Sequence, residues 1–173
     1  DYAFSKKRDA DNAKRMRTEW LRDYAALPPH RDQAVRSFIS RHHDASQIIG
    51  YNKVAFIFHM LSRKVGEKAL KLGIRMFWGR HKFQTASWED IQKSIEETSG
   101  LDLKTFFRQW IDRSGAPRLI MSNVFLEAGK VSFLLSQPEP PYSLNVPIKL
   151  ITKNGEETFQ VSISGKASQI DLH

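Results

Sequence analysis

The spacing of the apolar residues changes near Gly115-Ala116-Pro117, and this change constrains the fold more than any other feature of the sequence. Before this point apolar residues recur every three or four positions, which is typical of helices that bury one face. After it the apolar segments are short and are separated by turn residues, which is typical of strands. We therefore predict an α+β protein: a small helical array over residues 1–115, followed by a short-stranded, β-sandwich-like domain over residues 116–173.

The helical array is expected to consist of several short helices. The first ends at Pro28-Pro29, because proline cannot continue a helix. The helix over residues 50–65 is apolar nearly all round and should be the buried one. Ser87 is a clear N-cap, since carboxylates follow it in the first turn and Gly100 terminates the helix. Three further helices are predicted over residues 32–40, 67–78 and 101–115, and the apolar stripe of the first helix comprises Ala13, Met16, Trp20 and Tyr24.

The second part is expected to contain two hairpins and a final strand. Glu127-Ala128-Gly129 is a short glycine-containing loop, and Lys153-Asn154-Gly155 contains Asn-Gly, the strongest short hairpin signal. The strands predicted around these loops and at the end of the chain cover residues 119–126, 130–136, 142–152, 157–164 and 167–172.

The net charge of +8 lies entirely in the first part. From Ala116 onward the five basic residues are balanced by five acidic ones. A basic segment can bind nucleic acid or an anionic surface. Acidic residues are interleaved with the basic ones, as in KKRDADNAKRMRTEWLRD, which favours solvated helix faces over specific nucleic-acid binding. No apolar run approaches the roughly 18–20 residues that span a bilayer, so no membrane span is expected.

The sequence lacks the common patterns of a catalytic or metal-binding site. No two of its six histidines are three or four residues apart, HExxH is absent, and there is no cysteine to provide a thiolate. The adjacent pair His42-His43 is expected to be solvated, and His59, within the most apolar helix, is expected to be a hydrogen-bonded core residue. This chain alone is therefore predicted to bind no cofactor and to be inactive.

A string of motifs nevertheless resembles a known family. The sequence is similar to the segment downstream of the zinc ligands in the membrane alanyl aminopeptidase family of gluzincin metallopeptidases. The resemblance runs from about Ile48 to Pro117 and continues more weakly through Gln137-Pro138, Tyr142 and Val146-Pro147-Ile148. It is carried by Gly50-Tyr51-Asn52-Lys53-Val54-Ala55, by FHML with Gly66-Glu67, by Thr85-Ala86-Ser87-Trp88-Glu89-Asp90 and by SGLDLKTFFRQWIDRSGAP.

The resemblance implies a role for the chain in a larger protein. Members of the family hold zinc with an HExxH helix and a later glutamate, and they cut one residue from the N-terminus of a peptide. Those ligands are not in this sequence, so zinc is expected in the complete parent protein. The chain would be the C-terminal part of a zinc-dependent aminopeptidase-like protein, with the upstream zinc-binding part and the peptide substrate as its partners. It would form a wall of the cleft, and Tyr51 would donate a hydrogen bond to the oxyanion.

Two departures from that interpretation stay open. A glycine usually follows the lysine of the YxKG pattern, but this sequence has Val54, which favours a non-catalytic descendant that binds peptides or a partner protein. A basic nucleic-acid-binding module is the third alternative, supported by the charge and by Trp78 and Tyr24 near arginine and lysine. Residue chemistry alone favours a packing role for the ring of Tyr51 and a solvated position for Lys53 in the first turn of its helix.

Overall fold

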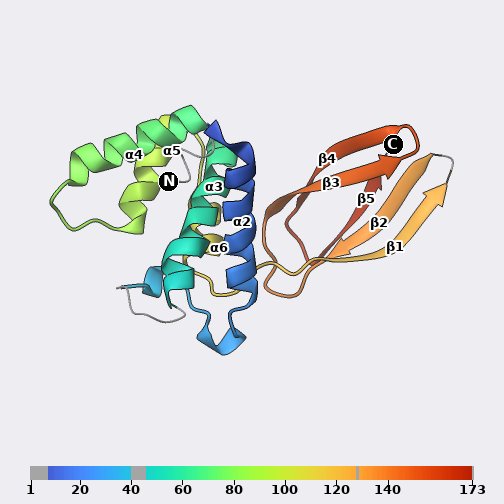
Figure 1. The fold of residues 1–173 in the computed structure, drawn as a ribbon, viewed down its shortest axis with the longest axis horizontal. Coiled ribbons are helices and arrows are strands. Elements are labelled where there is room, and N and C mark those ends of the chain that lie inside the picture. The colour runs from blue at the N-terminus through green and yellow to red at the C-terminus, as the bar shows by residue number, and fades with distance from the viewer. Residues whose placement is uncertain (1–7, 40–45, 128, 173) are drawn as a thin grey trace. The chain divides into compact units, whose positions relative to one another are not determined.

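A computed structural model describes residues 8–39, 46–127 and 129–172. The chain divides into two compact units, Asp1–Gly115 and Ala116–His173 (Figure 1). The first unit is helical and the second consists of strands, which confirms the predicted α+β class.

The helical unit contains five α-helices within its described residues. Their apolar faces meet in one core, in which Ile49, Ile95 and Leu103 are fully buried. Phe106 and Phe107 are also buried there, and Trp110 packs against them, so these three aromatic residues serve as core. The elements in chain order are α2 (Ala10–Ala25), η1 (Pro29–Arg31), η2 (Val35–Ser37), η3 (Ile48–Lys53), α3 (Val54–Val65), α4 (Glu67–His81), α5 (Trp88–Ser99) and α6 (Lys104–Ile111).

The helix predicted over residues 32–40 is wrong. Its described part contains only the single 3₁₀ turn η2, and the residues on both sides of that turn, Ala34 and Phe38, are extended. Asp32 is extended as well, and its carboxylate accepts tertiary hydrogen bonds instead of capping a helix. Ser40 lies outside the described residues. The last helix, predicted over residues 101–115, is also shorter than expected and spans only Lys104–Ile111.

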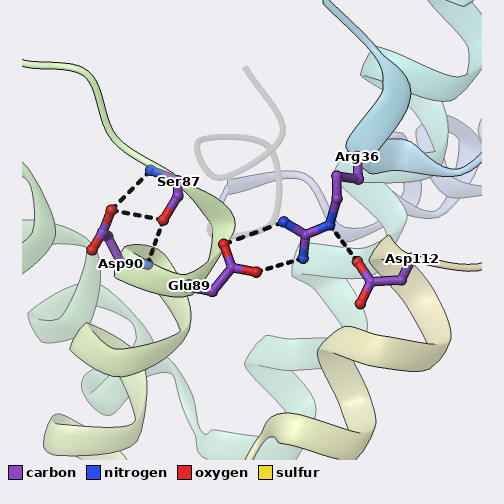
Figure 2. A network of polar contacts seen from close by, with 5 residues as sticks. All are labelled: Arg36, Ser87, Glu89, Asp90 and Asp112. Atoms are coloured by element: carbon purple, nitrogen blue, oxygen red, sulfur yellow. Dashed lines mark hydrogen bonds and ion pairs between the residues drawn. The ribbon is translucent and has the colours of Figure 1, made fainter.

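The start of α5 is as the sequence predicts. The Ser87 hydroxyl accepts a hydrogen bond from the Asp90 backbone N–H, and the Asp90 carboxylate accepts one from the Ser87 N–H at 2.9 Å (Figure 2). Gly100 ends the helix in the left-handed region, at φ 70°. A capping box at one end and a left-handed glycine at the other thus define α5.

The second unit forms two small antiparallel sheets. One sheet has the order β1-β2-β5 and the other pairs β3 with β4, so both predicted hairpins are confirmed. Residues of both sheets contribute to one buried cluster, which includes Phe133, Ile163 and Ile170. The strands are β1 (Ile120–Glu127), β2 (Lys130–Ser136), β3 (Leu144–Thr152), β4 (Gly155–Ile163) and β5 (Ala167–Leu172).

Buried Gln137 organises the segment that joins the two hairpins. Its amide oxygen accepts a hydrogen bond from the Tyr142 N–H at 2.9 Å, and its amide nitrogen donates to the carbonyls of Tyr142 and Gly165. A buried amide satisfied in this way specifies one conformation of the joining segment.

We expect Gly73 and Gly79, which lie on the same helix, to respond oppositely to alanine. A Cβ at Gly73 would lie 2.9 Å from the Ile95 Cα and from the Thr98 Oγ1, because α4 and α5 approach closely there. Gly73→Ala should therefore destabilise the protein by about 1–3 kcal/mol, as overpacking does. A Cβ at Gly79 would meet nothing within 4 Å, so Gly79→Ala should stabilise by roughly 0.4–1 kcal/mol. Urea denaturation of both variants measures the difference, and equal effects would contradict the close approach.

Candidate functional site

Tyr51 lies on η3, a π-helix that leads directly into α3. Such wide turns are rare, and they are frequent at functional sites. Tyr51 is 53% exposed, although Ile49 and Lys53, two residues before and two residues after it in the same turn, are buried. The ring of Tyr51 therefore makes an aromatic contact while much of the side chain remains accessible, which fits both a packing role and an exposed donor.

The ring of Tyr51 is held by Phe38. The two rings meet edge to face with their centroids 6.1 Å apart. Gly50 permits this arrangement, because a Cβ there would lie 2.4 Å from the Phe38 Cζ. The glycine before Tyr51 is thus required by a close contact with an aromatic ring and not by the backbone conformation.

Arg36 fixes the turn that precedes Phe38. Its guanidinium binds Glu89 with two nitrogens, at 2.7 and 3.2 Å, and its Nε donates to Asp112 at 2.7 Å (Figure 2). These two carboxylates raise the pKa of Arg36 above its ordinary value, and Arg36 in turn lowers the pKa of Glu89. One cation therefore joins η2 to the start of α5 and to the end of α6.

The residue after Tyr51 is anchored to α2. The Asn52 amide nitrogen donates to the Asp23 Oδ2 at 2.9 Å. Because Asp23 and Asn52 are 29 residues apart, no local pattern in the sequence reveals this pair.

Lys53 is buried, and the prediction that it is solvated is wrong. It is 7% exposed, and its Nζ donates to the Tyr24 hydroxyl at 3.1 Å and to the Gly115 carbonyl at 3.3 Å. The same nitrogen lies 3.7 Å from the Asp32 Oδ1 and 4.9 Å from the centre of the Tyr24 ring. Burial lowers the pKa of Lys53, and the nearby Asp32 carboxylate partly offsets this effect.

Asp32 completes the cluster around Lys53. Its Oδ2 accepts hydrogen bonds from the Tyr24 hydroxyl, at 2.7 Å, and from the Gly115 N–H. Its buried Oδ1 has no hydrogen-bond partner among the described residues and faces the lysine ammonium. The four residues Tyr24, Asp32, Lys53 and Gly115 thus form one buried ionic cluster, which connects α2, the loop after it, η3 and the end of the helical unit.

Tyr51 opens onto a shallow pocket of about 450 Å³. Among the described residues, the lining combines one carboxylate, two amides, a phenol and an aliphatic side chain, contributed by Asp23, Gln47, Ile48, Tyr51 and Asn52. Val54 is not among them, since its side chain is partly buried and packs against the core. This arrangement can donate a hydrogen bond from the tyrosine hydroxyl to a developing oxyanion, and it places a negative charge beside that donor.

The described residues do not provide a zinc site. No group of three histidine or acidic side chains among residues 8–39, 46–127 and 129–172 could hold a metal ion. His59 is partly buried against Phe56, and His81 stacks on Phe77, whereas His42-His43 and His173 lie outside the described residues. In that same part of the chain no helix has the length and apolar character needed to cross a membrane.

Comparisons with known proteins identify a family match. The family described as "Peptidase family M1 domain" matches residues 18–110. Aminopeptidase N of Haemophilus influenzae is 29% identical over 119 residues, which cover 64% of this chain and 14% of that protein. Aminopeptidase N of Streptomyces lividans is 33% identical over 94 residues, which cover 53% of this chain and 11% of that protein. The chain therefore spans only a small part of these relatives.

One solved structure extends the likeness to most of the chain. A crystal structure of Legionella pneumophila aminopeptidase A in complex with aspartic acid superposes with a TM-score of 0.64, covering 84% of this chain and 18% of that one. At 19% identity this similarity establishes the fold alone.

The buried ionic cluster predicts a large effect of removing Lys53. Lys53→Met leaves the Asp32 carboxylate buried beside a thioether, so we expect a loss of about 3–5 kcal/mol in the free energy of unfolding. The double variant Lys53→Met/Asp32→Asn should lose less free energy of unfolding than the sum of the losses of the two single variants, because neither buried charge then remains. Lys14→Met, at an exposed position of α2, is the control and should change stability by less than about 0.5 kcal/mol. Thermal and urea unfolding measure all four variants; an unaffected Lys53→Met would contradict the role of the cluster.

Proposed function

Since this chain belongs to peptidase family M1, we propose that it is the part of a zinc-dependent aminopeptidase that follows the metal site and forms one wall of the peptide-binding cleft. The observation that carries the proposal is the position of Tyr51. The family match includes this residue, and its side chain is half-exposed on a π-helix in which Ile49 and Lys53 are buried.

In this proposal the Tyr51 hydroxyl stabilises the transition state. When a water molecule attacks the scissile carbonyl, negative charge develops on the carbonyl oxygen, and a donor fixed in advance lowers the energy of that charge. The contacts of the two flanking residues support such fixing. Phe38 packs over Gly50 and holds the tyrosine ring, while Asn52 binds Asp23.

Zinc is assigned to the upstream part of the same polypeptide. The described residues contain no set of ligands that would fit the metal, so this chain contributes the oxyanion donor and the surface on which the peptide lies. The chain alone is accordingly expected to show no peptidase activity. Its partners in the reaction are the upstream zinc-binding part and the peptide substrate.

The packing of Val54 favours an active parent over a non-catalytic descendant. Its side chain is partly buried against the core and does not line the pocket, so its bulk leaves the pocket beside Tyr51 open. The nucleic-acid alternative receives less support, because Arg36 and Arg80, two cations of the basic unit, are each bound by carboxylates.

We expect Tyr51→Phe in the complete parent enzyme to lower kcat by about 10² to 10³, the usual loss for one oxyanion donor. KM should change little, because the ground-state carbonyl carries less charge and the ring contact with Phe38 is retained. Kinetics with an N-terminal aminoacyl substrate measure both constants, with zinc content and melting temperature as controls. Full activity of Tyr51→Phe would eliminate the hydroxyl from the mechanism.

Val54→Gly tests the departure from the family pattern in the same enzyme. Because the valine packs away from the pocket, we expect kcat to stay within about twofold of the parent and stability to fall, since apolar contacts are lost and a glycine enters a helix. A large rise in kcat would instead mean that the valine restrains Tyr51.

The assignment of the metal predicts that this chain alone, after dialysis, retains no stoichiometric zinc. Its cysteine-free sequence and the spacing of its histidines provide no ligand set. Elemental analysis is the measurement, and one tightly bound zinc per chain would place the metal site here.

A further inference from the structure

We propose that the pocket beside Tyr51 is a subsite for a cationic side chain of the peptide substrate, with the Asp23 carboxylate as its counter-charge. This inference rests on the proposed function, because it takes the Tyr51 hydroxyl to face the cleft. Tyr51 and Asp23 line the same pocket. If the Tyr51 hydroxyl reaches the reacting carbonyl, the Asp23 carboxylate is therefore also within reach of the bound peptide.

The pocket is large enough to receive the side chain of a residue next to the scissile bond. Its volume of about 450 Å³ lies within the range of roughly 300–1,000 Å³ that is typical of small-molecule sites. Consecutive residues of an extended peptide are about 3.3–3.6 Å apart, so a group that shares a pocket with the oxyanion donor belongs to a residue close to that bond.

The charge of the pocket selects a cation. Among the described residues that line the pocket, Asp23 alone is charged, and its side chain is 42% exposed. Gln47 and Asn52 add amide oxygens, which accept hydrogen bonds from an ammonium or guanidinium group. An anionic side chain would meet the Asp23 carboxylate, and no cation among the described lining residues would compensate for that repulsion.

Asp23 is oriented before the substrate arrives. The Asn52 amide binds its Oδ2 at 2.9 Å, and the Oδ1 is 3.9 Å from the Nε of Arg22. The Arg22 side chain is 76% exposed, and surface pairs of this kind contribute little free energy, so a substrate cation can replace it at the carboxylate. Because Asn52 belongs to η3, its hydrogen bond ties the Asp23 carboxylate to the segment that carries Tyr51.

The test compares lysine with norleucine, which has a similar length but no charge, at the residue on each side of the scissile bond in turn. In the complete enzyme, Asp23→Asn keeps an oxygen for the Asn52 amide and removes the charge. We expect the lysine-to-norleucine ratio of kcat/KM to fall by about tenfold to a hundredfold at one of the two positions, the range for one hydrogen bond to a charged group. Asp23→Glu should retain most of the preference.

Glu19→Gln is the matched control, because Glu19 is an exposed carboxylate one turn away on α2 that does not line the pocket. It should leave the ratio unchanged. If Asp23→Asn also leaves the ratio unchanged at both positions while the enzyme remains active, the subsite is overturned and the proposed function stands.

A binding measurement separates the subsite from catalysis. Acetyl-lysinamide, titrated at millimolar concentration into this chain, should shift the NMR signals of the Asn52 side-chain amide, and acetyl-norleucinamide should not. The shift should disappear in Asp23→Asn and persist in Glu19→Gln. If the shift is specific for acetyl-lysinamide but the complete parent has no peptidase activity, the cation site is supported and the proposed function is overturned. A shift that survives Asp23→Asn would overturn the subsite.

Discussion

The helical unit depends on a lysine ammonium taken out of water. Lys53 is buried with Asp32 as its counter-charge, and this pair is tolerated only because the Tyr24 hydroxyl, the Gly115 carbonyl and the Gly115 N–H satisfy the remaining polar atoms. These groups come from the first helix, the loop after it, the π-helix and the final turn of the unit. Segments whose hydrogen-bonded residues are up to 83 positions apart are therefore held together around one buried charge.

The same cluster determines where Tyr51 can lie. Lys53 is two residues away from it, so the end of the π-helix is held while the tyrosine side chain stays exposed. The Tyr51 ring itself contacts Phe38, whose segment is bound through Arg36 to the ends of two other helices. In the proposed role of Tyr51, rigid support around the exposed side chain would serve electrostatic stabilisation of a transition state, because a fixed donor needs no reorganisation during the reaction.

The sequence predicted those features that depend on local chemistry. The capping box of Ser87, both hairpins and the mixed fold class follow from turn residues and from the period of the apolar positions, and Tyr51 came from the family resemblance. The helix over residues 32–40 failed because Asp32 binds distant partners, and the solvated Lys53 failed for the same reason. Asp23 and Arg36 were missed because polar contacts between residues 29 to 76 positions apart leave no trace in local spacing.

The π-helix has a consequence for how this segment can change. A π-turn contains one residue more than an α-turn, because its hydrogen bonds join residues five apart instead of four. It is equivalent to a single-residue insertion absorbed by a helix, and side chains before and after it follow different helical registers. The core-facing residues of α3 can thus keep their contacts while a residue inside the turn is exposed. Length variation in this segment is for that reason a means of re-aiming one side chain without repacking the interior.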